Sequence, residues 1–198
     1  MGMMDMATVE QGINTKTKII ETAIGLAAKN GIEGLTIRDI CKNANISIGA
    51  FYHHFRSKEE LMDESFVIYD QALELNLKKY SDKDPVEALK GILLDQTDFV
   101  INIPKKLIIE YYKAILSAAN KGAVNTQRNY YKSVYHYVAR AQENHLFKQK
   151  YSIEYITEFY IKFVRGNIID WCLHDFSYNI LKQTSNEIDL ITKIFINK

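Results

Sequence analysis

Residues 36–58, TIRDICKNANISIGAFYHHFRSK, decide the fold, because they read as two short helices joined by a tight turn. Within the first helix, apolar residues recur at the spacing of one buried helical stripe, namely at Ile37, Ile40, Cys41 and Ala44. Asn43 and Asn45 interrupt the stripe, since asparagine hydrogen-bonds its own backbone and tolerates a left-handed turn. The stretch therefore predicts a helix-turn-helix.

Each helix of this stretch begins after a residue that can cap it. Thr36 precedes the first helix and Ser47 the second, where a side-chain oxygen can accept a hydrogen bond from a free backbone N–H group. Ser57 with Glu60 three residues later forms a capping box, which starts a third helix predicted over residues 57–79. We expect this third helix to connect the helix-turn-helix to the rest of the chain.

The second short helix presents an outward face that is small at its start and polar at its end. Phe51 and Phe55 are four residues apart, so they share the inward side. Helical periodicity then places the outward face on Gly49, Ala50, Tyr52 and His53. Such a helix can press its N-terminus against another surface while its far rim donates hydrogen bonds. A helix that reads the DNA major groove needs this arrangement.

Residues 15–64 resemble the N-terminal domain of TetR-family transcriptional repressors. The resemblance rests on KNGIEGLTIRDI (residues 29–40) and ISIGAFYHHFRSKEEL (residues 46–61), and RGNIIDWCLH (residues 165–174) resembles the penultimate helix of such proteins. It implies an all-α fold of about nine helices, with a three-helix DNA-binding domain before a larger effector-binding and dimerisation bundle. We place a mobile arm at residues 1–13, the DNA-binding domain at 14–65 and the C-terminal domain at 66–198.

The chemistry of the side chains and the family resemblance together predict which residues contact DNA. Phosphates are typically bound by hydroxyls at helix starts and by polar or cationic side chains beside the groove. We therefore predict phosphate contacts from Thr36, Ser47, Tyr52, His53 and Lys58. His54 either joins them or is a structural histidine. Base contacts are predicted for Ile48, Gly49, Ala50, His53 and Arg38. Since the main base-facing residues offer no bidentate amide or guanidinium, we expect A/T-leaning recognition with much readout of DNA shape.

Composition bounds the remaining possibilities. The chain is 47% hydrophobic and 12% aromatic, enough for a substantial core, and no apolar run reaches the length of a membrane span. Cys41 and Cys172 each lie in an apolar helical pattern, which favours reduced thiols and a cytoplasmic protein. Net charge is only +1, yet residues 16–58 hold seven lysines and arginines against three acidic residues, a local +4.

The rest of the chain is also predicted to be helical, over residues 15–30, 85–101, 104–120, 126–144, 152–174 and 188–196. The resemblance implies an effector pocket in its C-terminal part, and the aromatic candidates for its lining are Tyr111, Tyr112, Tyr130, Tyr131, Tyr135, Tyr137, Trp171 and His174. Residue by residue, a packed core with tyrosine hydroxyls at the surface is the simpler interpretation. A mostly apolar cavity with a few polar groups is the alternative.

The resemblance further implies a homodimer in which the last two helices pair with those of a second subunit. The candidates for this interface are Phe159, Phe163, Gly166, Ile169, Ile188, Ile191, Ile194 and Phe195. A helix-turn-helix protein reads two half-sites about 34 Å apart as a dimer. In an isolated chain the same apolar stripes can instead pack inward.

Together with the resemblance, these patterns predict a ligand-responsive repressor that binds a palindromic operator in double-stranded DNA and is released by a small-molecule effector. An activator of the same family, and a helical small-molecule carrier with an unused helix-turn-helix, remain as alternatives. No catalytic residue, metal ligand or cofactor is predicted, since the sequence has no Gly-rich phosphate loop, HExxH motif or paired cysteines. We therefore do not expect an enzyme, and we expect no membrane association.

Overall fold

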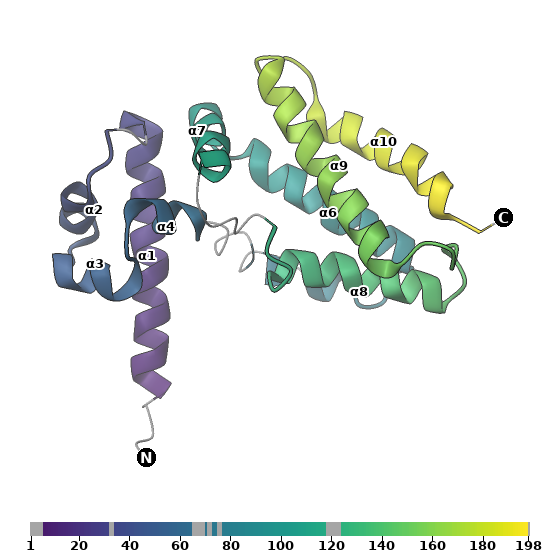
Figure 1. The fold of residues 1–198 in the computed structure, drawn as a ribbon, viewed down its shortest axis with the longest axis horizontal. Helices are drawn as coiled ribbons and strands as arrows, with labels where there is room; N and C mark the ends of the chain where they lie inside the picture. The colour runs from purple at the N-terminus through teal and green to yellow at the C-terminus, as the bar shows by residue number, and fades with distance from the viewer. Residues whose placement is uncertain are drawn as a thin grey trace. The chain divides into compact units, whose positions relative to one another are not determined.

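A computed structural model describes residues 6–31, 34–64, 70, 73–74, 77–117 and 124–197 of the chain (Figure 1). The chain forms two compact units: unit 1 is Met1–Ile68 with Lys106–Val124, and unit 2 is Tyr69–Lys105 with Asn125–Lys198. Throughout the described ranges the regular structure is helical, apart from an isolated bridge between Phe147 and Ile196. The all-α prediction is confirmed.

Unit 1 is built on helix α1 (Met6–Asn30), which packs against α2 (Ile37–Ala44). Helices α3 (Ile48–His54) and α4 (Lys58–Asp63) follow, and α7 (Lys105–Ser117) lies in this unit except for its first residue. The inward stripe of α1 consists of Ile19, Ile20, Ala23 and Ala27, all buried. Gly31 ends α1 with φ at 79°, and its N–H donates to the Ala27 carbonyl at 2.8 Å. Glycine suits this C-terminal cap because it accepts a positive φ without strain.

The turn between α2 and α3 depends on one asparagine. Asn45 has φ 54° and ψ 52°, the left-handed conformation expected of it. Its N–H donates to the Lys42 carbonyl at 3.3 Å, and the N–H of Ile46 donates to the Cys41 carbonyl at 3.0 Å. These two bonds satisfy carbonyls at the end of α2 and fix the direction in which the chain enters α3.

The described residues of unit 2 form a bundle of four long helices. They are α6 (Pro85–Ile101), α8 (Asn129–Glu143), α9 (Ile153–Leu173) and α10 (Ile180–Phe195), and Figure 1 shows them gathered together. Helix α6 packs on α8, α9 and α10, while α9 also packs on α8 and α10. Among the largest fully buried side chains are Leu89 and Ile92 on α6, Tyr160 on α9 and Phe195 on α10. Short helix η1 (Leu77–Tyr80) precedes the bundle.

Two predicted helices begin earlier than their apolar patterns indicated. The last helix starts at Ile180 and not at residue 188, because Asn179 caps it by accepting from the Lys182 N–H at 2.9 Å. Because the first half of this helix is mostly polar, it has no continuous apolar pattern from which a helix could be predicted. The first helix starts at Met6, so residues 6–13 are helical where an arm was predicted. Once a helix is nucleated, each added residue gains a hydrogen bond without needing a buried stripe.

The third predicted helix, over residues 57–79, is only partly described. It starts as expected, since the Ser57 hydroxyl accepts from the Glu60 N–H at 3.2 Å. Helix α4 ends at Asp63, and residues 65–69, 71–72 and 75–76 lie outside the described part of the chain. At its far end, Leu77–Tyr80 is a 3-10 helix and not the end of a long α-helix.

Candidate nucleic-acid interface

Thr36 at the start of α2 is both a cap and an exposed hydroxyl. Its Oγ1 accepts from the Asp39 N–H at 3.1 Å and donates to the Asp39 carboxylate at 2.5 Å. The predicted capping is therefore confirmed, and the hydroxyl proton is already used inside the protein. A phosphate oxygen at this position would be received by the exposed start of the helix.

Helix α3 is fixed from within by two aromatic rings and from its start by a serine. The Ser47 hydroxyl accepts from the Ala50 N–H at 3.0 Å, while Phe51 and Phe55 are fully buried with their ring centroids 5.7 Å apart. The two faces of α3 are thus oriented as its periodicity predicts. A Cβ added at Gly49 would meet only the Ser47 Oγ, at 3.8 Å, so the start of the outward face is open.

The outward face of α3 exposes two large side chains that a soluble domain has no internal reason to expose. The exposed fractions are 46% for Ile48 and 54% for Tyr52. His53 beside them is exposed, whereas His54 is half-buried. An apolar side chain at the helix start, followed by hydrogen-bonding rings, can contact a thymine methyl and phosphates respectively.

His54 has the character of a structural histidine. Burial lowers its pKa, and the neighbouring His53 and Lys16 lower it further. Its ring lies 5.1 Å from that of His53 and 6.4 Å from that of Phe55. Of the two histidines, His53 therefore has the better position for a phosphate contact.

Lys58 at the start of α4 makes a contact within unit 1. Its Nζ donates to the Leu35 carbonyl at 3.2 Å, next to the Thr36 cap. The ammonium therefore also links the start of α4 to the start of α2. This long-range contact was not foreseen, because only the tertiary structure brings residue 35 beside residue 58.

All ten predicted DNA-contacting residues lie in unit 1, between the start of α2 and the start of α4. The exposed ones are Thr36, Arg38, Ser47, Ile48, Gly49, Tyr52 and His53, and the half-buried ones are Ala50, His54 and Lys58. Arg56, between α3 and α4, is an additional exposed cation that the outward-face argument omitted. Its signal was present in the local excess of lysine and arginine.

The residues predicted to line the effector pocket lie in both units. Tyr111 and Tyr112 lie on α7 in unit 1, with rings 5.4 Å apart in an edge-to-face arrangement. In unit 2, α8 carries two buried tyrosines, Tyr130 and Tyr137, and two half-buried ones, Tyr131 and Tyr135. The lining of a pocket therefore stays a prediction.

Tyr131 and Tyr135 form a stacked pair at the side of α8. Their ring centroids are 6.3 Å apart, and the Tyr135 hydroxyl donates to Glu154 Oε1 at 3.3 Å. Burial raises the pKa of Tyr131, and the negative charge of Glu154 raises that of Tyr135. Both phenols are hydrogen-bond donors at neutral pH.

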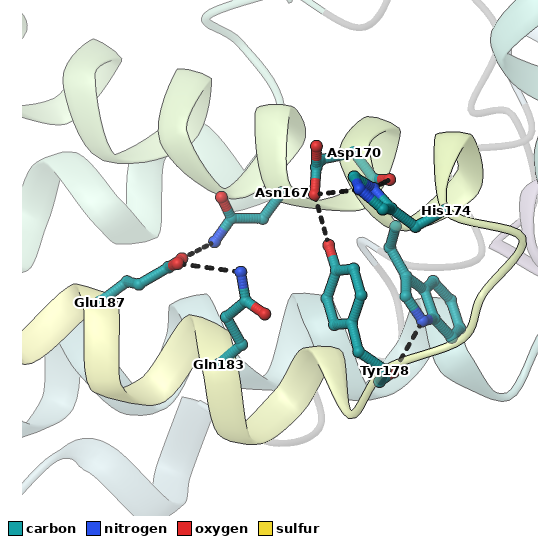
Figure 2. A network of polar contacts seen from close by, with 7 residues as sticks. Asn167, Asp170, His174, Tyr178, Gln183 and Glu187 are labelled. Atoms are coloured by element: carbon teal, nitrogen blue, oxygen red, sulfur yellow. Dashed lines mark hydrogen bonds and ion pairs between the residues drawn. The ribbon is translucent and has the colours of Figure 1, made fainter.

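Trp171 lies in the last turn of α9 and His174 is its C-cap residue. Figure 2 shows His174 at this junction between α9 and α10. The indole Nε1 of Trp171 donates to the Tyr178 carbonyl at 2.9 Å. His174 is exposed, with Nδ1 2.9 Å from the Asp170 carbonyl and 3.4 Å from its carboxylate. The Tyr178 hydroxyl donates to the same carboxylate at 2.8 Å. In this structure the indole N–H of Trp171 and the Nδ1 of His174 thus stabilise the helix junction.

The predicted dimer residues are of three kinds. Gly166, Ile169 and Ile194 are exposed, whereas Phe159, Phe163 and Ile191 are half-buried. Ile188 and Phe195 are 2% exposed and belong to the core of unit 2, because their side of α10 packs inward. Leu173 and Leu190 were missed, although they are 77% and 63% exposed. Leu173 continues the helical spacing of Gly166 and Ile169, which the sequence already contained.

Other kinds of site find little support in the described residues. They contain no group of three or more His, Cys, Asp or Glu that could hold a metal ion. Burial raises the pKa of both Cys41 and Cys172, so neither is an activated thiol. None of the helices among these residues is long and apolar enough to cross a membrane.

Comparison with known proteins agrees with the helix-turn-helix geometry. Residues 19–64 match the sequence model of the family described as bacterial regulatory proteins, tetR family. This part of the chain is thus of the TetR type. It is 23% identical over 202 residues to a probable acrEF/envCD operon repressor of Escherichia coli K12, covering 98% of this chain and 92% of that one. The HTH-type transcriptional repressor KstR2 of Mycobacterium tuberculosis is 34% identical over 82 residues, 39% of this chain and 40% of its own.

Solved structures of other proteins have the same fold as this chain. Thermus thermophilus FadR, a TetR-family repressor in complex with lauroyl-CoA, superposes with a TM-score of 0.73 at 15% identity, covering 89% of this chain and 93% of FadR. The RolR complex with resorcinol superposes with a TM-score of 0.63 at 16% identity, covering 90% and 87%. At these identities the likeness concerns the fold.

Proposed function

We propose that this protein is a ligand-responsive transcriptional repressor that binds a palindromic operator as a homodimer in the cytoplasm and is released by a small-molecule effector. The observation that carries the proposal is the outward face of α3. Ser47 caps the helix, two buried phenylalanines fix its rotation, and Ile48, Gly49 and Tyr52 face outward. A major-groove reading helix requires that orientation.

The proposed DNA contacts are of two kinds: contacts to phosphates, which position the protein, and contacts to base edges, which read the sequence. Ser47, Tyr52 and His53 offer N–H or O–H donors to phosphates on the two sides of the groove, and at Thr36 the exposed start of α2 offers backbone N–H groups. Ile48, Gly49 and Ala50 lie at the start of α3, where base edges are read, and Arg38 on α2 is exposed nearby in sequence. Lys58 adds positive charge while holding the start of α2.

The proposed dimer uses the exposed apolar face of α9 and α10. Gly166, Ile169 and Leu173 follow one another along α9, and Leu190 and Ile194 are exposed on α10. Exposed apolar residues aligned along two neighbouring helices indicate a surface that a partner covers. Sedimentation velocity on the full chain tests this, since a monomer at micromolar concentration would contradict the dimer.

The proposed effector site is in the C-terminal part of the chain, with tyrosines supplying both apolar area and hydrogen-bond donors. Two fold relatives were solved with an organic ligand, lauroyl-CoA and resorcinol respectively, which supports a small organic effector here. The effector acts only through its different affinity for the DNA-competent and DNA-incompetent states. Chemical screening against the DNA complex would identify it.

DNA binding by fluorescence anisotropy tests the function directly. The full chain is titrated into labelled DNA from beside its own gene and into a scrambled fragment, each at two salt concentrations. We expect salt-sensitive binding that prefers the native fragment by about 1,000-fold or more, the usual ratio of specific to non-specific affinity. Equal weak binding to both, repeated with fragments from other promoters, would favour the carrier. A reporter assay separates a repressor from an activator.

A further inference from the structure

One side of α10 carries polar and apolar residues together on the outside of unit 2. Its members are Gln183, Glu187, Leu190 and Ile194. Their helical spacing places them on one side of the helix. Leu190 and Ile194 are 63% and 49% exposed, Gln183 is exposed, and Glu187 is half-buried. The proposed dimer would cover this side, and with it one amide and one carboxylate.

Hydrogen bonds join the polar members of this side to α9 (Figure 2). Asn167 Nδ2 on α9 donates to Glu187 Oε2 at 2.7 Å, and Gln183 Nε2 donates to Glu187 Oε1 at 3.0 Å. Asn167 Nδ2 also donates to the Thr184 hydroxyl at 3.2 Å. Each oxygen of the carboxylate therefore accepts one N–H, and both N–H groups of the Asn167 amide are used within the subunit.

This network still has hydrogen-bonding capacity on its outer side. A carboxylate offers about four lone-pair positions, of which the two bonds from Asn167 and Gln183 use only part. The Gln183 amide has a second N–H, for which the described residues supply no acceptor. In the described part of the chain no lysine, arginine or histidine forms an ion pair with Glu187.

An entirely apolar surface is a poor cover for such groups. A carboxylate that is buried without donors for its remaining positions loses its hydration and gains nothing in return. A second copy of the chain does not have this defect. A two-fold interface brings the same patch together from both subunits, so the copy supplies amide N–H groups as well as apolar side chains.

We propose that the network of Asn167, Gln183 and Glu187 selects the partner subunit, accepting a copy of this chain over an apolar helical face that lacks these polar groups. This inference rests on the proposed homodimer through α9 and α10. Leu190 and Ile194 supply apolar area, whereas the network sets which chain can cover it. A buried polar residue at a helical interface can specify pairing in this way, at a cost in stability.

The test measures subunit exchange between full chains by native mass spectrometry. Isotope-labelled wild type is mixed with unlabelled Q183L/E187L, which removes both polar side chains of α10 and leaves the Asn167 bond to Thr184. The measured quantity is the squared concentration of the mixed dimer divided by the product of the two unmixed ones. It is read after labelled and unlabelled wild type have exchanged completely in a parallel sample. A thermal melt checks folding, and E187L takes the place of the double variant if that variant shows no cooperative transition.

The control is K182L/D189L, on the side of α10 that faces α6. Lys182 and Asp189 are both exposed, and the Asp189 carboxylate accepts from Lys90 Nζ at 2.6 and 2.7 Å. This variant also replaces two polar side chains of α10 by leucine, and one of them is again a carboxylate that bonds within its own subunit. It differs from Q183L/E187L in the side of the helix that is changed.

We expect the ratio for K182L/D189L to equal that for wild type with itself. The ratio for Q183L/E187L should be lower by about tenfold or more, which corresponds to about 1.4 kcal/mol. On its own, Q183L/E187L should dimerise at least as tightly as the wild type, because apolar side chains replace covered polar ones. An unchanged ratio, a monomeric variant or an equal fall in the control would overturn the inference and leave the proposed dimer intact. A monomeric wild type would overturn the dimer itself, and this inference with it.

Discussion

The surroundings of Gly49 on α3 and Gly166 on α9 are similarly open, whereas those of Gly91 on α6 are closely packed. A Cβ at Gly49 would meet one serine oxygen at 3.8 Å, and a Cβ at Gly166 would meet nothing within 4 Å. At Gly91 it would collide with the Tyr80 ring at 2.3 Å. Of these three glycines, the fold of one subunit therefore explains only Gly91. At positions 49 and 166 the proposed function supplies the reason, namely DNA at the first and a second subunit at the other.

The largest effect is expected for Gly49→Trp. A Cβ at the exposed Gly49 meets only the Ser47 Oγ, at 3.8 Å, so thermal stability should stay close to that of the wild type. The added indole would stand between α3 and the groove, and operator affinity should fall by about 1,000-fold or more, to the non-specific level. Anisotropy measures this. Gly25→Trp is the matched control, because Gly25 is likewise open, with nothing within 4 Å of an added Cβ, and no DNA contact is predicted for that part of α1. Equal loss in both variants would refute the assigned face.

Gly166→Trp should instead separate the subunits. The added ring would hold α9 away from its partner and weaken the dimer about 100-fold, which corresponds to about 3 kcal/mol. Sedimentation velocity across a concentration series measures the shift toward monomer. The variant should also lose operator affinity, whereas Gly49→Trp should remain dimeric. A Gly166→Trp chain that stays fully dimeric would place the interface elsewhere.

Gly91→Ala should lower stability without touching either surface. The methyl group would overlap the Tyr80 ring, and overpacking of this kind costs about 1–3 kcal/mol. A thermal melt should show the loss, and the double variant with Tyr80→Leu should recover part of it because the ring is gone. An undiminished melting temperature in Gly91→Ala would show that Tyr80 moves aside without cost.

Tyr52→Phe should weaken binding modestly and for every DNA sequence alike. The loss of one phosphate hydrogen bond is worth about 1 kcal/mol, or about fivefold in affinity. Tyr155→Phe is the control, since Tyr155 on α9 is 55% exposed and Tyr52 is 54% exposed. Anisotropy with native and scrambled DNA compares them. A selective loss for the native fragment would reassign Tyr52 from positioning to base reading.

His54→Gln should change the pH dependence of stability more than DNA binding. The pKa of His54 is lowered in the fold, so the unfolded chain binds a proton more readily. Above the ordinary histidine pKa of about 6.5, the ring is neutral in both states and the folded state is not penalised. As the pH falls below that value, the unfolded chain gains a proton more readily, so the free energy of unfolding decreases. Thermal melts at pH 7.5 and 5.5 should therefore differ less in His54→Gln than in the wild type. His136→Gln, at an exposed position on α8, should leave the difference unchanged.

The caps and the turn of the helix-turn-helix in unit 1 could be predicted from the sequence, because they depend on local interactions. Thr36, Ser47 and Asn45 act on neighbours within a few residues, so their spacing already specified the caps and the turn. The inward positions of Phe51 and Phe55 likewise follow from helical periodicity. The start of α10 was predicted eight residues too late because Asn179 caps a polar first half that carries no continuous apolar signal.

The sequence by itself determined that the chain is helical, that residues 36–54 form a helix-turn-helix, and which face of α3 is outward, because each depends on residues close in sequence. Only the tertiary structure showed that Asp70 meets Arg128, that Lys58 reaches Leu35, and that Ile188 and Phe195 face the core. Those contacts join residues far apart along the chain. Helical periodicity identifies an apolar side but does not state whether that side meets the chain's own core or a partner.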